Sequence, residues 1–364
     1  MKKVYIIFVF SFSLVSNLSA QIADSSQLSF TGCIDAYYAY YTDSLGQNNF
    51  QQFPSVSPRS NQFGLNTIMF TADYVSQNVR ATTSIHLGDI ANSSWSSTYN
   101  HIMEAHAGFK LCKKVWLDAG IFRTHVGTEG LLPKENIASS ISVGTYYEPY
   151  YESGIRFNYA ANNDLTLNLF LLNGYNLIED NNHKKSLGLL VNYKVDDRIN
   201  IGYSNYTGDD SPIADTASHL RIHNCAFVNY QSYKFKAQIG GDFCFQQNVM
   251  TLNGNSNSPN ATMMSGVLSL KYACGHHVSI YARGEMFNDP EGFMSMLFTD
   301  SLNNQTGLNI NGITAGVEIQ PTENSYIRIE SRELMAAEEQ ELFYWNADFS
   351  NKRFEYMINF GLSF

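Results

Sequence analysis

Residues 353–364, RFEYMINFGLSF, alternate without a break between two kinds of side chain. Successive side chains of a β-strand point to opposite faces, so this stretch predicts a strand with one apolar face and one mostly polar face. In a water-soluble protein, such an aromatic strand would be an edge that favours aggregation unless something covered it. The apolar parity holds Phe354, Tyr356, Ile358, Phe360, Leu362 and Phe364.

The N-terminal residues predict export. Lys2 and Lys3 precede the apolar run VYIIFVFSFSLV, and the small residues Ser19 and Ala20 follow it. A short basic region, an apolar stretch of this length and a small-residue end are typical of a cleaved secretory signal. A membrane anchor is the alternative, but it would need about 20 apolar residues. We therefore expect a signal peptide over residues 1–20 and a single domain over residues 21–364.

The composition favours a membrane β-barrel. The chain has 23 Tyr, 24 Phe and 25 Gly, and only 15% of its residues are charged. Soluble surfaces usually carry about 25 to 35% charged residues. Alternating strands with one apolar face suit a barrel that meets lipid outside and water inside. The cell outer membrane is the expected location.

Alternation recurs in sixteen segments, which begin near residues 28, 62, 78, 101, 115, 151, 164, 186, 197, 219, 233, 261, 276, 307, 324 and 353. Short joints alternate with long segments at 43–61, 89–100, 124–150, 174–185, 207–218, 247–260, 287–306 and 333–352. Short periplasmic turns and long extracellular loops are typical of outer-membrane barrels. The sequence thus predicts an all-β, antiparallel transmembrane barrel of about sixteen strands, with fourteen or eighteen as alternatives. Pairing of the last strand with the first would remove the exposed edge.

Several stretches resemble a known family. They are GCIDAYYAYY (32–41), NQFGLN (61–66), AGIFRTHVGTEGLLPKEN (119–136) and LNGYN (172–176). The sequence is similar here to the putative beta-barrel porin-2 (OmpL-like) family of Bacteroidetes-type outer-membrane proteins. The resemblance implies a porin-like channel.

Segment 124–150 is the longest predicted outer loop, and it has a mixed set of charges. A loop that folds inward could narrow a pore and place a transverse field or a solute contact there. The alternative is an ordinary surface loop. The constriction candidates in and beside this segment are Arg123, His125, Glu129, Lys134, Glu135 and Glu148.

Strand parity also predicts which charges face the lumen. The basic set is Arg80, Arg156, Arg221, Lys234, Lys236, Arg283 and Arg328, and the acidic set is Asp35, Glu104, Asp242, Glu285, Glu318 and Glu330. Rings of one sign select ions of the other sign, but both signs are nearly equal here, so neither anion nor cation preference is predicted. The alternative role for these pairs is to cross-link the inner wall.

The favoured function is an outer-membrane porin for passive diffusion of small hydrophilic solutes. The alternative is a receptor or adhesin barrel with a closed pore, which would bind a partner through loops 287–306 and 333–352. In the second loop, RELMAAEEQELF (332–343) has the composition of a short helix. A third alternative is a hydrolase, since Ser84 and His86 share a strand face. Neighbours on one face lie about 6.5 Å apart, however, so a dyad would need partners from another strand.

No cofactor or metal is expected. The five cysteines are scattered without paired spacing, and His223 with Cys225 supplies two ligands without a third. The net charge of −10 argues against nucleic-acid partners. The expected partners are outer-membrane lipid, small solutes, the barrel assembly machinery through Phe364, and further copies of this chain in a homo-oligomer. Tyr37, Tyr38, Tyr40 and Tyr41 are expected in the outer aromatic girdle, and Phe360 and Phe364 in the periplasmic one.

Overall fold

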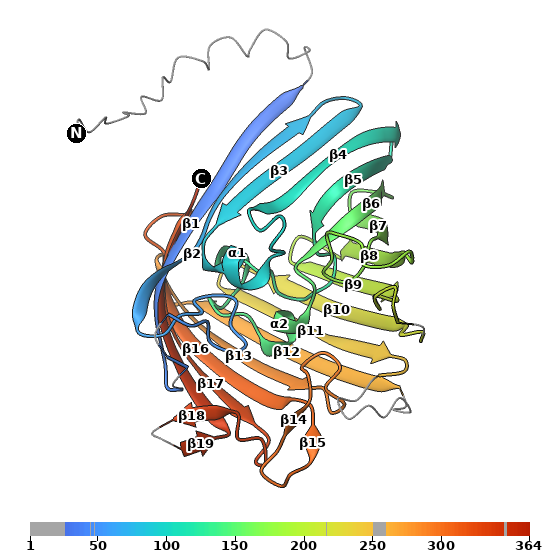
Figure 1. Ribbon diagram of the computed structural model, residues 1–364. Helices are drawn as coiled ribbons and strands as arrows, with labels where there is room; N and C mark the ends of the chain where they lie inside the picture. The colour runs from blue at the N-terminus through green and yellow to red at the C-terminus, as the bar shows by residue number, and fades with distance from the viewer. Residues whose placement is uncertain (1–25, 44, 47, 216, 250–259, 346–347) are drawn as a thin grey trace, which may run out of the picture.

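The computed structural model describes residues 26–43, 45–46, 48–215, 217–249, 260–345 and 348–364. Its principal feature is a closed antiparallel barrel of sixteen strands, which follow one another around the wall in chain order (Figure 1). The predicted strand number is therefore confirmed. The proposed signal peptide lies outside the described residues.

The barrel strands are β1 (Gln27–Tyr41), β2 (Gln62–Val75), β3 (Val79–Leu87), β4 (Ile102–Cys112), β5 (Val115–Arg123), β6 (Tyr151–Ala160), β7 (Leu165–Leu172), β8 (Ser186–Lys194), β9 (Ile199–Gly208), β10 (Arg221–Gln231), β11 (Phe235–Gln246), β12 (Ala261–Ala273), β13 (Val278–Asn288), β16 (Asn309–Ile319), β17 (Ser325–Ala336) and β20 (Lys352–Ser363). Each begins within three residues of the start that alternation predicts. The connections confirm the predicted rule, because short turns join the strands at one end and long loops join them at the other.

The long loops contain the remaining short elements. These are α1 (Asp89–Ser94), the 3-10 helix η2 (Pro133–Glu135), α2 (Val143–Tyr147), and two hairpins made by β14 (Phe298–Thr299) with β15 (Gln305–Thr306) and by β18 (Phe343–Trp345) with β19 (Asp348–Ser350). None of the helices among the described residues is long and apolar enough to cross a membrane.

Closure of the barrel explains the aromatic last strand. β20 pairs with β1 from Cys33↔Ser363 to Tyr41↔Glu355, and it pairs with β17 on its other side. Gly32 and Phe364 extend the seam, because the N–H of each donates to the carbonyl oxygen of the other, at 3.0 and 3.1 Å. Both edges of β20 are therefore satisfied.

The two faces of β20 separate as predicted. Tyr356, Phe360, Leu362 and Phe364 are exposed on the outer surface, whereas Glu355 and its inward neighbours are buried. An outward apolar row is stable in lipid because hydrocarbon, unlike water, does not oppose its exposure.

Four cross-strand pairs on the inner face combine an aromatic residue with glycine. The pairs are Tyr37↔Gly64, Phe227↔Gly202, Tyr281↔Gly316 and Tyr326↔Gly361. In each pair the ring lies directly over the glycine, where a Cβ atom would overlap the ring atoms. Glycine therefore provides the space that lets the ring lie flat against the neighbouring strand.

Two sequence predictions about the outer part of the barrel are wrong. Tyr37 and Tyr41 belong to the inner face rather than the girdle, and their hydroxyl groups donate to Asp89 Oδ2 at 2.6 Å and to the Ser57 carbonyl at 2.8 Å. Only Tyr38 and Tyr40 have the outward parity, and Tyr40 is exposed. The prediction had grouped four adjacent tyrosines although alternation divides them.

The predicted helix over residues 332–343 is also wrong. Residues 332–336 belong to β17, where Arg332 pairs with Glu355 and Met335 with Lys352, and the chain continues through a turn to β18. Pairing with two neighbouring strands outweighs the helical propensity of this composition.

Candidate functional site: the inward loop

Segment 124–150 lies inside the barrel, because its backbone groups bond to inward side chains of distant strands. Gln238 on β11 donates through Nε2 to the Thr128 carbonyl at 2.7 Å. Arg328 on β17 donates to the carbonyl oxygens of Pro133, Asn136 and Ala138 at 2.7 to 3.0 Å. We call residues 124–150 the inward loop.

Carboxylates on the same wall hold the second half of the inward loop. Glu330 on β17 accepts from the backbone N–H groups of Ser139 and Ser140 at 2.7 and 3.1 Å. Glu285 on β13 accepts from the Val143 N–H at 2.7 Å, at the start of α2. Hydrogen bonds to charged groups are stronger than neutral ones, so each carboxylate fixes one stretch of loop backbone.

Arg283 on β13 connects the inward loop to the wall. It forms ion pairs with Glu129 of the loop and Glu285 of its own strand, both at 3.2 Å, and it donates to the Ser140 carbonyl. Its side chain is buried. A buried guanidinium needs such partners, because burial removes its hydration.

The ion pairs continue along the inner wall from β13 to β20. Arg332 pairs with Glu285 at 2.9 Å and Glu355 at 3.2 Å, and Arg353 pairs with Glu355 at 2.5 Å and Asp43 at 3.1 Å. All five side chains are buried. With Arg283 and Glu129 they form one network, which we call the wall network.

His125 anchors the start of the inward loop. Its Nδ1 lies 2.7 Å from a Glu152 carboxylate oxygen, and its Nε2 lies 2.9 Å from the Asn205 carbonyl oxygen. Two acceptors require a proton on both ring nitrogens, so the geometry fits an imidazolium. Burial lowers the pKa of His125, but the charge and hydrogen bond of Glu152 outweigh burial and raise it above the usual value.

Glu148 is at the end of the inward loop, in a buried group with Cys225 on β10 and Asp242 on β11. Ligand atoms of the three residues lie within 4.8 Å of one another. Burial and the nearby Asp242 charge raise the pKa of Glu148 well above its usual range. Asp242 already accepts from Ser265 Oγ at 2.6 Å and lies 3.0 Å from His223 Nε2. The group therefore attaches the loop end to the wall through shared polar contacts.

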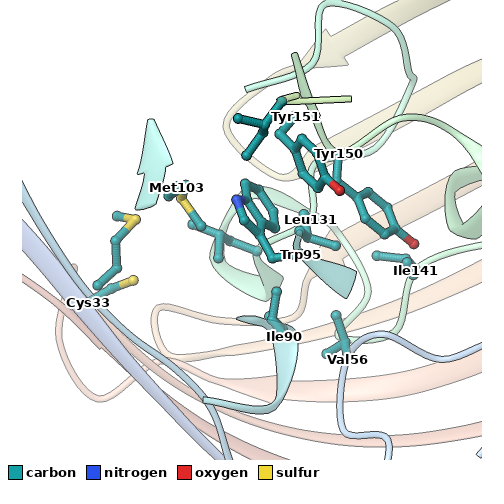
Figure 2. Packing of buried hydrophobic residues seen from close by; sticks show 12 residues of the cluster. Cys33, Val56, Ile90, Trp95, Met103, Leu131, Ile141, Tyr150 and Tyr151 are labelled. Atoms are coloured by element: carbon teal, nitrogen blue, oxygen red, sulfur yellow. The ribbon is translucent and has the colours of Figure 1, made fainter. Parts of the chain in front are cut away.

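Apolar packing supports the inward loop from its other side. Leu131, Leu132 and Ile141 of the loop join a buried cluster with Trp95 and Ile90 from the segment around α1 (Figure 2). Burial of each large aliphatic side chain contributes about 1.5–3 kcal/mol. The loop is thus held by both a charged and an apolar face.

Cavities lie on both sides of the inward loop. A space of about 770 Å³ at the short-turn end is bordered by Lys134 and Ile137 of the loop. At the long-loop end, a space of about 280 Å³ is bordered by Tyr146 and Tyr147 of the loop. The loop therefore separates an inner space, which we call the vestibule, from the outer loops.

The predicted charges divide into two groups. Ten are buried, which fits the alternative role of cross-linking the inner wall: Asp35, His125, Glu129, Glu148, Asp242, Arg283, Glu285, Glu318, Arg328 and Glu330. Four of the wall residues, Arg283, Glu285, Arg328 and Glu330, are covered because the inward loop bonds directly to them. The second group keeps access to solvent and consists of Arg80, Glu104, Arg123, Lys134, Glu135, Arg156, Arg221 and Lys236. Lys234 is not on the wall, because it lies in the turn between β10 and β11.

Important residues were missed by the sequence prediction. They include Asp118, which pairs with Arg80 at 2.5 Å and with Arg156 at 3.1 Å, and the network residues Arg332, Arg353 and Glu355. Parity places all four on inward positions, so alternation alone could have identified them.

The pair proposed for hydrolysis forms no dyad. The Ser84 and Thr71 hydroxyl groups lie 2.7 Å apart, and the His86 ring packs edge-on against Trp95 at 4.5 Å between centroids. Both residues thus have structural contacts with their neighbours.

A family model described as putative beta-barrel porin-2, OmpL-like, matches residues 27–364. The chain belongs to this family. The family and the barrel fold place the protein in the outer membrane as a porin. The predicted family, fold and general function are confirmed.

Solved porin structures share the fold at low sequence identity. An anion-selective porin from Comamonas acidovorans has a TM-score of 0.63 and 9% identity, with 93% of this chain and 100% of that chain covered. The outer-membrane channel DcaP of Acinetobacter baumannii has a TM-score of 0.62 and 10% identity over 93% and 98%. OmpF of Salmonella typhi, in complex with daunomycin, has a TM-score of 0.59 and 10% identity over 94% and 98%. The sequence matches none of the curated proteins with which it was compared.

Proposed function

We propose that the porin passes small hydrophilic solutes by passive diffusion and that the inward loop sets the width of its path. The principal support is the set of bonds from β9, β11, β13 and β17 to the loop, since they hold it across the interior. A polar vestibule beneath the loop supplies the wet part of the path.

Single-channel conductance in a planar bilayer tests this proposal. Purified, refolded barrel should give stable current steps, and a variant lacking residues 128–147 should give larger steps. Retention of the heat-dependent gel shift would show that the variant still folds. If the folded wild-type barrel stays silent, diffusion is not its function. If the deletion leaves step size unchanged, the loop does not set the width.

A receptor or adhesin with a closed pore is the second candidate. It is supported by exposed apolar side chains at the long-loop end, namely Ile213, Met296, Leu302 and Phe349. Exposed apolar residues on extracellular loops fit contact with a macromolecular partner. Folded protein that gives no current steps but binds cell-surface material through these loops would favour this candidate.

The remaining expectations extend the proposal. We expect no catalytic activity, cleavage of the signal after Ala20, assembly through recognition of Phe364, and self-association in the membrane. Phe364 is 62% exposed beside the seam, where another protein can reach its ring. N-terminal sequencing tests cleavage, and Phe364→Asp should reduce membrane assembly.

A further inference from the structure

The vestibule is a large polar space on the route that any solute would take. It is lined by residues of β8 to β12, β16 and β17, by the short turns, and by residues 134–137 of the inward loop. Its volume of about 770 Å³ would hold a small organic solute together with water.

Cations outnumber their partners on one wall of the vestibule. Lys271 and Arg328 both bond to the single carboxylate of Glu318. Lys236 on β11, the next strand, has no ion pair among the described residues, and its side chain is exposed to the space. This wall therefore has more positive charge than its carboxylates neutralise.

Lys134 of the inward loop places a further cation at the border of the vestibule. It lies at the vestibule border in η2, and among the described residues it has no carboxylate partner, only a contact with the Cys33 thiol. Its neighbour Glu135 is already paired with Arg123 at 2.7 Å. The roof of the vestibule thus presents an ammonium group whose charge is not neutralised locally.

Most acidic groups of the lining are engaged elsewhere. Asp197 pairs with Lys194 at 2.6 Å, and Asp196 accepts from the N–H groups of Arg198 and Ile199 at 2.7 and 2.8 Å. Glu323 lies on an exposed turn at the border of the space. The lining carboxylates therefore leave Lys134 and Lys236 open to a solute.

Two further arginines lie on the opposite wall of the inner half. Arg80 and Arg156 share the single carboxylate of Asp118, and both side chains keep about a quarter of their exposure, at 24% and 23%. Asp73 on the neighbouring β2 also faces inward and accepts from Thr82 at 2.6 Å, so this wall has as many carboxylates as arginines. The excess of cations therefore lies on the wall of Lys236.

The net negative charge of the protein lies at the other end of the barrel. Three long loops contribute Asp209, Asp210, Asp215, Asp289, Glu291, Asp300, Glu338, Glu339, Glu341 and Asp348. The overall charge of −10 thus says little about the vestibule.

We infer that the vestibule contains a binding subsite for small organic anions that carry several carboxylates, with the ammonium groups of Lys236 and Lys134 as its principal donors. The inference specifies the solute class and rests on the proposed pore function. Ammonium groups donate to carboxylate oxygens from several directions, so they accept anions without strict geometry. Asn229 and Gln231 at the lining offer further amide donors.

The zero-current potential across a KCl gradient tests the charge preference. The wild-type pore should prefer chloride, and K236E combined with K134E should lower the chloride-to-potassium permeability ratio. A unit charge about 7 Å from an ion in water changes the local ion concentration roughly threefold at low salt. We therefore expect at least that change for the double variant.

K234E is the matched control. It makes the same change of charge two residues from Lys236, but in the turn outside the strand wall. Its permeability ratio should stay close to that of the wild type. An equal change in K234E, or a wild-type pore without chloride preference, would overturn the inference while leaving the pore function intact.

Citrate binding gives a readout that needs no conduction. Calorimetric titration of citrate into the refolded full-length barrel in detergent should show salt-sensitive binding in the wild type and in K234E, with at least tenfold weaker binding in the double variant. Absence of binding in the wild type, or binding that the double variant retains, would overturn the subsite. Binding by a barrel that shows no current steps would instead reject only the pore function.

Discussion

The wall network and the vestibule use the same charged residue types in opposite ways. In the wall network, Arg283, Arg332 and Arg353 are buried and each contacts two carboxylates. In the vestibule, by contrast, the side chain of Lys236 is exposed and has no ion pair among the described residues. Both regions lie on the inner face of one barrel, so strand parity does not distinguish them.

The inward loop decides whether a wall charge is buried and paired or exposed and unpaired. Where residues 124–150 lie against the wall, water is excluded and every charge needs a partner nearby. Where the loop leaves the wall wet, water solvates an unpaired cation at little cost. The comparison shows that wall charges covered by the inward loop bind the loop in place. Wall charges that border the vestibule remain available to solutes.

The largest expected effect comes from breaking the wall network. Arg283→Met leaves Glu129 and Glu285 without a shared partner, and loss of one member of a buried ion pair costs about 3–5 kcal/mol. Urea unfolding in lipid vesicles should show that loss, and the conductance of any folded fraction should increase as the loop detaches. A cost below about 1 kcal/mol would mean that these charges are solvated, and the comparison would fail.

A smaller loss of stability is expected at Tyr281, which contacts Glu330, one of the carboxylates that hold the inward loop. Tyr281 lies over Gly316, and its hydroxyl donates to Glu330 at 3.0 Å. Gly316→Ala should displace the ring and cost about 1–3 kcal/mol, as overpacking usually does. Gly284→Ala is the control, since a Cβ at Gly284 meets nothing within 4 Å. Equal stability of the two variants in the urea experiment would contradict the packing described here.

The His125 anchor should make the covered half sensitive to pH. Because folding raises the pKa of His125, its stabilisation is fully present below the unfolded pKa and is lost as the pH rises through the folded pKa. The free energy of unfolding should therefore fall above about pH 6.5 in the wild type and fall less steeply in His125→Gln. Parallel pH profiles would show that the Glu152 pair does not depend on a charged imidazole.

The smallest effect on stability is expected at the partly exposed Arg156 on β6, outside the lining of the vestibule. Arg156→Met removes one of two cations that share Asp118, and a partly exposed pair contributes about 0–1 kcal/mol. The same variant should still lower the chloride preference measured by zero-current potential. A stability loss as large as that of Arg283→Met would contradict the distinction between covered and solvent-exposed wall charges.

The sequence predicts the barrel well because alternation is a local signal. The strand starts and the alternation of short turns with long loops depend on residues that are neighbours in the chain. The pairing of residues 353–364 with the first strand follows from pairing of the strands in chain order. Burial of the wall charges depends instead on contacts far apart in the chain. Arg283 and Lys236 have the same inward parity, yet only Arg283 meets the inward loop, through Glu129 and Ser140.

Local composition also misled where pairing decided the outcome. The helix expected over residues 332–343 yields to strand pairing of β17 with β20, and the four tyrosines of β1 divide between two faces. The first error concerns neighbours across strands, which a single sequence does not show, whereas the second could have been avoided by applying alternation to each tyrosine.

The aromatic–glycine pairs have a consequence for how this sequence can vary. At Gly64, Gly202, Gly316 and Gly361, any side chain would collide with the ring on the adjacent strand unless that ring also changed. A shift of the strands by one residue would likewise place a side chain beneath each ring. A glycine can therefore be replaced without a loss of stability only together with its aromatic partner. The two positions of each pair are expected to vary together in evolution.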